Sequence, residues 1–160
     1  MSLHYILDGY NILKQMAPLR DLPLEEGRRR LLRWIDLSRP QGSLKNQVIV
    51  VFDGHPDHFG NSNQNDIRVI FSDGCSADDK IKRMVEEDSD QKNCVVVSDD
   101  KDIFLYARSL GARIMSVSTF TTAKIQHSHG RQETGGKYIS LSRQESINQE
   151  LGEIWLKEKK

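Results

Sequence analysis

The sequence is poor in cysteine and lacks long apolar runs, and each absence excludes a class of protein. Its two cysteines, Cys75 and Cys94, are too few for a disulfide framework and lack the spacing of a metal-binding motif. No apolar run approaches the roughly 18 residues of a membrane span, and no basic segment followed by an apolar stretch opens the chain as in a secretory signal. We therefore expect a protein of the reducing cytoplasm with no membrane partner.

The chain also lacks an excess of either charge. Lysine and arginine together number 23, and so do aspartate and glutamate. Net charge therefore gives no indication of nucleic acid or a membrane surface as a partner, and the distribution of charges has to be read instead. With 37% hydrophobic and 29% charged residues, the composition is that of an ordinary globular protein. At 160 residues we expect a single domain.

Short runs rich in β-branched residues alternate with helical patterns. We expect strands at residues 5–7, 48–52, 68–71, 95–97 and 113–117, and helices at about 24–37, 77–87 and 101–110. The runs 48-VIVVF-52 and 95-VVV-97 are continuously apolar, which is typical of strands buried on both faces. The alternation predicts an α/β fold with a mostly parallel sheet of about five strands, flanked by helices on both faces.

The last quarter of the chain has a different character. Residues 121–136 are polar and show no clear period, so we expect a mobile loop there. Residues 142–160 then show a helical pattern, with apolar residues on one face. We expect residues 121–160 to belong to the same domain as residues 1–120.

Aspartates follow three of the predicted strands. Asp8 follows the first strand, Asp53 follows the second, and Asp99 and Asp100 come just after residues 95–97. The carboxyl ends of parallel strands share one edge of a sheet, and ligands bind at that edge. Any one of these aspartates could equally start a turn or cap a helix. Three segments together favour a shared site.

The helix predicted at residues 77–87 supplies a fourth group of acids. Its apolar positions define a stripe, and at about 100° per residue Asp78 lies at the margin of this stripe while Asp79 points to the opposite side. We therefore expect Asp78 to face the sheet edge. The alternative is that both acids only interact favourably with the helix dipole, which suits Asp79 better.

Several carboxylates in one pocket cannot all stay ionised without compensation. Either some of them are protonated or a cation binds among them. Because the predicted cluster contains oxygen ligands and no nearby histidine or cysteine, it favours a hard ion, Mg²⁺ or Mn²⁺. Asp8 is thus predicted to be a metal ligand.

Four segments in this order and spacing resemble the YacP-like NYN domains, a branch of the PIN-like nucleases. They are 8-DGYN-11, 52-FDG-54, 76-SADDKI-81 and 97-VSDDKD-102, and the resemblance covers about residues 3–120. It implies a PIN-like α/β sheet, Mg²⁺ or Mn²⁺ bound by clustered acids, and activity as a ribonuclease or RNA-processing factor.

The resemblance also assigns residues by position. Asp8 and Asn11 match the acid and the asparagine after the family's first strand, and Asp53 resembles the acid at the end of the second strand. Asp100 matches the acid after the fourth strand, and Asp102 the additional acid beyond it.

Two assignments stay open at this point. Either Asp78 or Asp79 matches the acid that opens the family's central helix. Asp99 is an extra acid beside Asp100, where many relatives have a polar neutral residue.

The chemistry that fits is hydrolysis of an RNA phosphodiester by metal-activated water. The residues expected in catalysis are Asp8, Asn11, Asp78, Asp100 and Asp102. The acids expected to bind metal, directly or through water, are Asp8, Asp53, Asp78, Asp79, Asp100 and Asp102. Asn11 either positions the scissile phosphate and Asp8 or simply caps the helix that follows.

RNA would be held by cations outside the acidic pocket. The densest basic cluster consists of Arg28, Arg29, Arg30 and Arg33, although such a run is also typical of a solvated helix face. The second candidate is the polar loop, with Lys124, His127, His129, Arg131 and Lys137, followed by Tyr138 as a base-stacking residue. The histidine pair and 55-HPDH-58 are interpreted as loop residues rather than metal sites.

The leading hypothesis is a metal-dependent endoribonuclease that acts on single-stranded or structured RNA, with mRNA and ribosome-associated RNA as candidate substrates. A second hypothesis is a non-catalytic RNA- or ribosome-binding module that keeps the fold. A phosphatase with an Asp-x-Asp pair after its first strand is disfavoured, because this position reads Asp8-Gly9-Tyr10. The sequence leaves the oligomeric state open.

Overall fold

Strands and helices alternate along the chain, and this confirms the predicted α/β class. A computed structural model describes residues 2–55 and 66–122. Its strands are β1 (His4–Asp8), β2 (Gln47–Phe52), β3 (Ile67–Phe71), β4 (Cys94–Val97) and β5 (Arg113–Met115). Its helices are α1 (Gly9–Gln15), α2 (Ala17–Arg20), α3 (Leu24–Ser38), α4 (Ala77–Glu87), α5 (Lys101–Ser109) and α6 (Val117–Thr122), with a 3-10 turn η1 (Gln91–Asn93) before β4.

The strands of the described residues form one parallel sheet in the order β3-β2-β1-β4-β5. In the central strand β1, Leu7 pairs with Val50 of β2 on one side and with Val97 of β4 on the other. After β3 the chain crosses back over the sheet to β4, so the strand order reverses beside β1. Ligands bind at the carboxyl edge next to such a reversal, and Asp8 ends β1 there.

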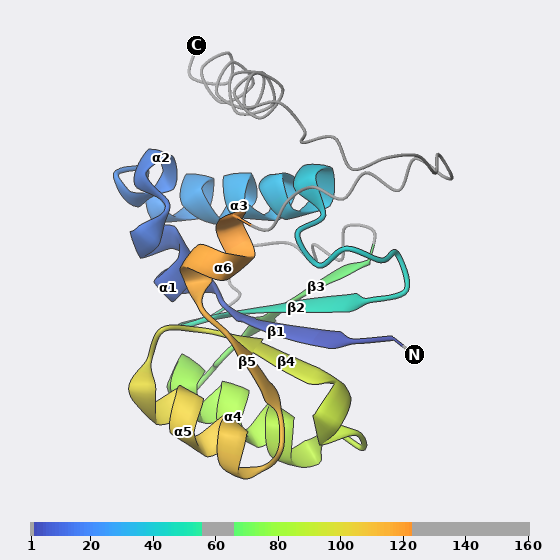
Figure 1. Cartoon of the computed structure of the whole chain (residues 1–160). Helices are drawn as coiled ribbons and strands as arrows, with labels where there is room; N and C mark the ends of the chain where they lie inside the picture. The colour runs from blue at the N-terminus through green and yellow to red at the C-terminus, as the bar shows by residue number, and fades with distance from the viewer. Residues whose placement is uncertain (1, 56–65, 123–160) are drawn as a thin grey trace, which may run out of the picture. The chain divides into compact units, whose positions relative to one another are not determined.

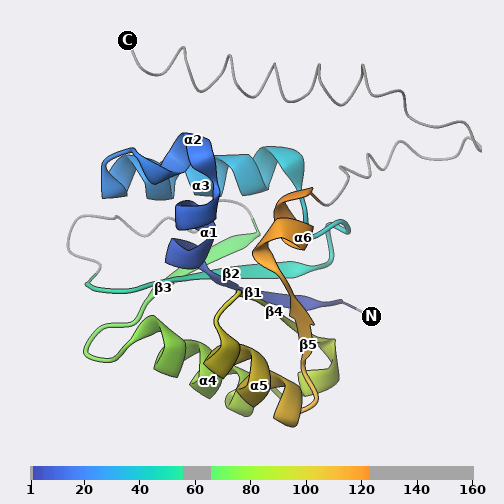
Figure 2. The same cartoon turned by 60° about the vertical axis from the view of Figure 1, so that its left-hand side comes forward.

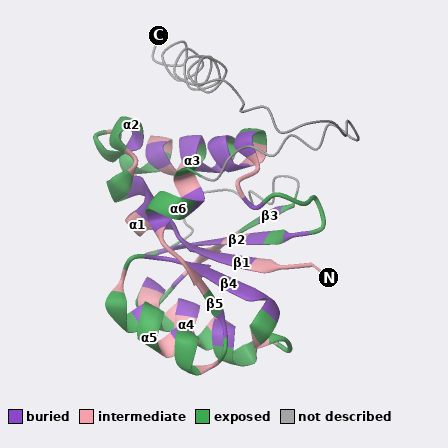
Figure 3. Ribbon diagram, viewed as in Figure 1, coloured by how far each residue is buried: buried purple, intermediate pink, exposed green. Residues whose placement is uncertain are grey.

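Helices cover both faces of the sheet. α1, α2, α3 and α6 lie on one face, and α4 and α5 on the other (Figures 1 and 2). Ile6 and Val96 pack with Ile81 on the α4 and α5 face, while the ring of Tyr5 lies 6.2 Å from that of Phe120 on the opposite face. The three inner strands β2, β1 and β4 are accordingly buried along most of their length, whereas the edge strands β3 and β5 are more exposed (Figure 3). None of the described helices combines the length and the apolar character needed to cross a membrane.

The helices next to the site begin at side-chain caps. α4 covers the predicted range because Ser76 Oγ accepts the N–H of Asp79 at 3.1 Å. α5 begins after Asp100, whose Oδ1 accepts the N–H of Asp102 at 2.8 Å. Both helices thus begin at the carboxyl edge of the sheet, after β3 and β4.

The carboxyl end of β5 differs from the prediction. The predicted strand reaches residue 117, whereas β5 ends at Met115 and Val117 begins α6. The reason is capping: Asp99 Oδ1 accepts the N–H of Val117 at 3.0 Å, and Ser116 Oγ accepts the N–H of Thr119 at 3.1 Å. Residues 121 and 122 are therefore helical instead of opening the predicted loop. The rest of that loop and the predicted terminal helix lie outside the described residues.

Candidate active site

Asp8 is a buried carboxylate, 6% exposed, at the carboxyl end of β1. Its Oδ1 accepts the N–H of Asn11 at 3.5 Å, so it caps α1, and its Oδ2 accepts the hydroxyl of Ser98 at 3.3 Å. Burial raises the pKa of Asp8, and the negative charges of Asp78 and Asp100 raise it further, whereas the two hydrogen bonds act in the opposite direction. Asp8 is thus desolvated and faces two other acids.

Gly9 allows α1 to begin directly over β2. A Cβ on this residue would lie 2.4 Å from Cε1 of Phe52 and 3.0 Å from the carbonyl oxygen of Val51. Such contacts are too close for any side chain, and Phe52 is fully buried. The glycine after Asp8 therefore lets the helix pack against the strand end where Asp8 lies.

Asp78 and Asp100 form an acidic pair beside Asp8. Asp78 lies half-buried in the first turn of α4, on the inner side that the helical periodicity predicts. Burial raises the pKa of Asp78, the charge of Asp100 raises it next, and a side-chain hydrogen bond with Asp100 adds to the rise, while Lys82 lowers it. The structure therefore brings acids from β1, α4 and the segment after β4 to one place.

Ser98 connects these acids, and the sequence analysis assigned it no role. It is 3% exposed, and its Oγ accepts the N–H of Asp100 at 3.1 Å while it donates to Asp8. Nδ2 of Asn11 also lies 3.5 Å from this oxygen. A hydroxyl two residues before a helix-capping aspartate is the local signal that could have identified it.

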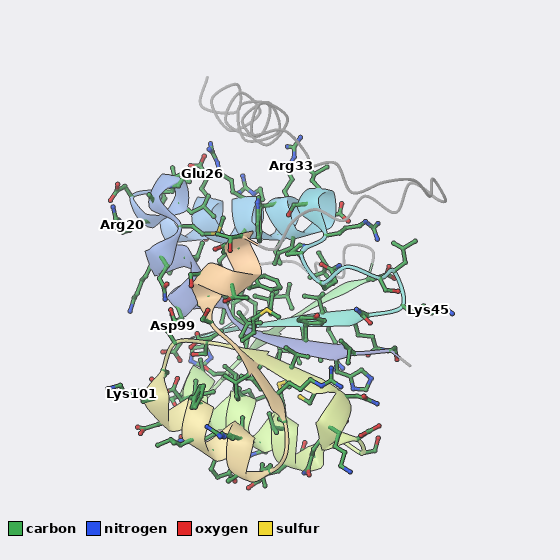
Figure 4. All side chains as sticks on the ribbon, viewed as in Figure 1. Arg20, Glu26, Arg33, Lys45, Asp99 and Lys101 are labelled. Atoms are coloured by element: carbon green, nitrogen blue, oxygen red, sulfur yellow. The ribbon has the colours of Figure 1, made fainter. Side chains whose placement is uncertain are left out.

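The adjacent residues Asp99 and Asp100 make different contacts. Asp99 is exposed, and its carboxylate accepts hydrogen bonds from the N–H of Val117 and from Nε2 of Gln15. Figure 4 shows Asp99 at the edge of the sheet where the helices begin. It thus joins α6 to α1, whereas Asp100 faces Asp78.

The other predicted acids lie farther out. Asp79 and Asp102 are exposed in the first turns of α4 and α5. Asp53 is also exposed, and its Oδ1 accepts the hydroxyl of Ser72 at 2.9 Å. Across residues 2–55 and 66–122, no three acidic, histidine or cysteine side chains form a ready-made metal ligand set. A cation at the cluster would therefore need additional oxygen ligands.

The four arginines of α3 do not form one basic face. Arg30 is 4% exposed and forms an ion pair with Glu26, so it does not lie on the surface where the sequence analysis expected it. Arg28 is half-buried, whereas Arg29 and Arg33 are exposed, and Figure 4 shows Arg33 on the outer side of the helix. The reason is that successive residues of an amphipathic helix point to different sides.

Of the histidines in the two predicted loop segments, His55 lies within the described residues. His55 is exposed, and its Nδ1 lies 2.6 Å from Oδ1 of Asp73, which agrees with its interpretation as a loop residue. The remainder of 55-HPDH-58 lies outside the described residues, as do Lys124, His127, His129, Arg131, Lys137 and Tyr138.

Comparison with known proteins identifies relatives. A sequence profile of the YacP-like NYN domain matches residues 5–159. A crystal structure of a mutant of Rae1 (YacP) from Bacillus subtilis is similar, with a TM-score of 0.58 and 25% identity, covering 74% of this chain and 71% of that chain. Another crystal structure of Rae1 (YacP) from this organism has a TM-score of 0.55 and 21% identity, covering 99% of this chain and 90% of that chain. A search of curated proteins gave no match.

The profile includes the segments that carry Asp8, Asp78 and Asp100 and extends almost to the end of the chain. The similar crystal structures share the parallel sheet with flanking helices. The resemblance expected from the sequence is thus confirmed. The chain belongs to the YacP-like NYN domain family, which has a nuclease-like domain.

Proposed function

We propose that this protein is a metal-dependent endoribonuclease that hydrolyses phosphodiester bonds in RNA. The observation that carries the proposal is the convergence of Asp8, Asp78 and Asp100, with the pKa values of Asp8 and Asp78 both raised. Perturbed carboxyl groups at a sheet's carboxyl edge are typical of functional sites. Lys82 compensates only part of the negative charge, because the pKa of Asp78 stays raised beside it.

Mg²⁺ or Mn²⁺ fits this cluster. The donors are all carboxylate oxygens, which hard cations prefer, and the pKa values of Asp8 and Asp78 are both raised, although Lys82 offsets part of the rise at Asp78. Asp8, Asp78 and Asp100 would hold the ion, with Asp79, Asp102 and Asp53 as outer acids. When bound, such an ion supplies an activated water and stabilises charge on the phosphate. Because the described residues lack a complete ligand set, water and phosphate oxygens would fill the remaining positions.

The chain's own residues would orient the reacting groups. Ser98 and the N–H of Asn11 fix the two oxygens of Asp8, so this carboxylate cannot rotate freely. The side-chain amide of Asn11, near Ser98, could donate to a phosphate oxygen. Hydrolysis joins a water oxygen to phosphorus and releases the leaving oxygen, which takes up a proton. The exposed Asp102 would orient the water.

RNA in the cytoplasm, either mRNA or RNA on the ribosome, is the proposed substrate class. The exposed Arg29 and Arg33 on α3 support a contact with a polyanion. The incomplete metal ligand set among the described residues favours one second candidate, a non-catalytic RNA- or ribosome-binding module.

One cleavage assay separates these candidates. Labelled RNA and single-stranded DNA are incubated with the wild-type protein in Mg²⁺, in Mn²⁺ or in EDTA. We expect cleavage of RNA that requires metal and is lost in Asp78→Asn. Glu87→Gln, which removes an exposed charge at the other end of α4, is the matched control and should cleave normally. RNA binding without cleavage in any metal would favour the binding module.

A further inference from the structure

Arg28 lies within a group of aromatic rings near the acid cluster. Its guanidinium carbon is 5.5 Å from the ring centroid of Tyr10, 5.4 Å from that of Phe52 and 5.2 Å from that of Phe71. Nη2 also donates to the hydroxyl of Tyr10, which in turn donates to the carbonyl of Asp53 at 3.2 Å. The guanidinium is therefore held in place by three cation–π contacts and one hydrogen bond.

The charge and the hydrogen-bonding capacity of Arg28 are only partly satisfied. Within residues 2–55 and 66–122 it forms no ion pair with a carboxylate. A guanidinium has five N–H donors, and the donor on Nε is buried without a partner. Partial burial of an unpaired cation is costly, and an apolar side chain would fill the same space among the rings without this cost. An incoming anion would provide the missing partner.

The rings place this cation beside the proposed reaction site. Tyr10 follows Asp8 by two residues in α1, and Phe52 packs against Gly9 between them. Phe71 pairs with Phe52 at the carboxyl ends of β3 and β2. Adjacent strands are about 4.8 Å apart, so β3 lies roughly 10 Å from β1 along the same edge. A strand of nucleic acid that crosses this edge would meet the acids first and Arg28 next.

We propose that Arg28, held by Tyr10, Phe52 and Phe71, is a subsite for a backbone phosphate of single-stranded RNA close to the scissile phosphate. A guanidinium binds phosphate with a two-pronged fork, and its fixed position reduces the entropy lost on binding. The subsite rests on the proposed ribonuclease function because RNA is its ligand. The proposal assigns this subsite to Arg28. The exposed Arg29 and Arg33 could at most bind phosphates farther along the strand.

The test is a binding measurement that requires no catalysis. Fluorescence anisotropy of a labelled single-stranded RNA, in EDTA and at several salt concentrations, gives the affinity and its salt dependence. In Arg28→Met, an apolar chain of similar length replaces the cation. We expect its affinity to fall about tenfold and its salt slope to decrease by about 0.7, the value for one lost phosphate contact on a single strand.

Two further variants make the result decisive. Arg83→Met removes an exposed arginine of α4 and should leave affinity and slope unchanged. Arg28→Lys keeps the charge but loses the fork, so it should bind RNA several-fold more weakly with nearly the wild-type slope. If Arg28→Met and Arg28→Lys bind like Arg83→Met, Arg28 only packs the rings and the subsite does not exist. If Arg28→Met does not fold, wild-type affinity in Arg28→Lys overturns the proposal.

Failure of the subsite and failure of the ribonuclease proposal give different results. A protein that never cleaves RNA but loses affinity in Arg28→Met has the subsite without the proposed chemistry. A protein that cleaves RNA and binds it equally well without Arg28 has the chemistry without the subsite.

Discussion

Aspartates lie at the two ends of β1 in opposite electrostatic settings: Asp88, which follows α4, at the amino end and Asp8 at the carboxyl end. At the amino end, Nδ1 of His4 lies 2.9 Å from Oδ2 of Asp88, and the N–H of Asp90 donates to Asp88 Oδ1 at 2.9 Å. Burial by itself raises the pKa of Asp88, but these two hydrogen bonds outweigh burial and lower it. At the carboxyl end, burial and neighbouring acids leave the pKa of Asp8 raised in spite of its hydrogen bonds.

This difference separates stability from function within one strand. An aspartate with a lowered pKa stabilises the fold when ionised, whereas one with a raised pKa reduces stability when ionised. The amino end of β1 is therefore arranged as a structural contact. The carboxyl end retains an unfavourable charge, which is expected where a ligand supplies the compensation. Substitution of Asp88 should consequently lower stability and spare activity, whereas substitution of Asp8 should abolish activity without lowering stability.

The largest expected effect is on cleavage by Asp8→Asn. Removal of the proposed metal ligand Asp8 should cost more than the 10- to 100-fold roughly expected for an outer-sphere residue, so RNA cleavage should fall by more than about 100-fold. Thermal stability near neutral pH without metal should hold or rise, because a desolvated charge that two other acids repel is removed. Single-turnover cleavage and a melting curve measure the two effects. A variant with full activity would remove the main support for the site.

The sequence predicts the features that depend on local signals. The apolar runs identify β2 and β4, and the helical period with Ser76 gives the bounds of α4. The same period distinguishes Asp78 from Asp79. These features follow from side chains that are only a few residues apart in the sequence, so no knowledge of the fold is needed.

Other features depend on contacts between distant segments. Val117 continues an apolar pattern, and it begins α6 because Asp99, 18 positions earlier, accepts its N–H. The hydrogen bond of Ser98 to Asp8 spans 90 positions. The burial of Arg30 and the aromatic surroundings of Arg28 likewise arise when α3 packs on the sheet. No local pattern contains this information.

The next effect in size concerns the packing that positions Asp8. Gly9→Ala should lower stability by about 2 kcal/mol, because its Cβ would overlap the buried ring of Phe52. It should also reduce cleavage by displacing Asp8. Gly27→Ala in α3 is the matched control: the nearest atom to its Cβ would be 3.5 Å away, and alanine favours a helix by about 1 kcal/mol. Urea unfolding of both variants tests this contrast, and equal effects would contradict it.

A smaller shift is expected when metal binds at the carboxyl end. A ligand at ten times its Kd stabilises a protein by about 1.4 kcal/mol, which corresponds to roughly 3–5 °C in Tm. Mn²⁺ should therefore raise Tm in the wild type and not in Asp100→Asn. Asparagine caps a helix about as well as aspartate, so α5 should keep its start. An unchanged Tm at millimolar Mn²⁺ would argue that the aspartates act as caps.

The smallest effect is expected at the amino end of β1, where Asp88→Asn should cost about 1 kcal/mol of stability near neutral pH and leave RNA cleavage unchanged. Because the pKa of Asp88 is lowered in the fold, its contribution is present above the ordinary value near 3.9 and is lost as pH falls through the folded value. The stability difference between wild type and Asp88→Asn should therefore shrink as pH falls through the lowered pKa of Asp88. Glu87→Gln, which changes the exposed neighbour, is the control and should leave stability near that of the wild type. Urea unfolding at several pH values, with cleavage assays on the same samples, measures both effects. If Asp88→Asn impaired cleavage as strongly as Asp8→Asn, the separation between the two ends of β1 would be wrong, since a charge that only stabilises the fold has no reason to affect chemistry at the opposite edge.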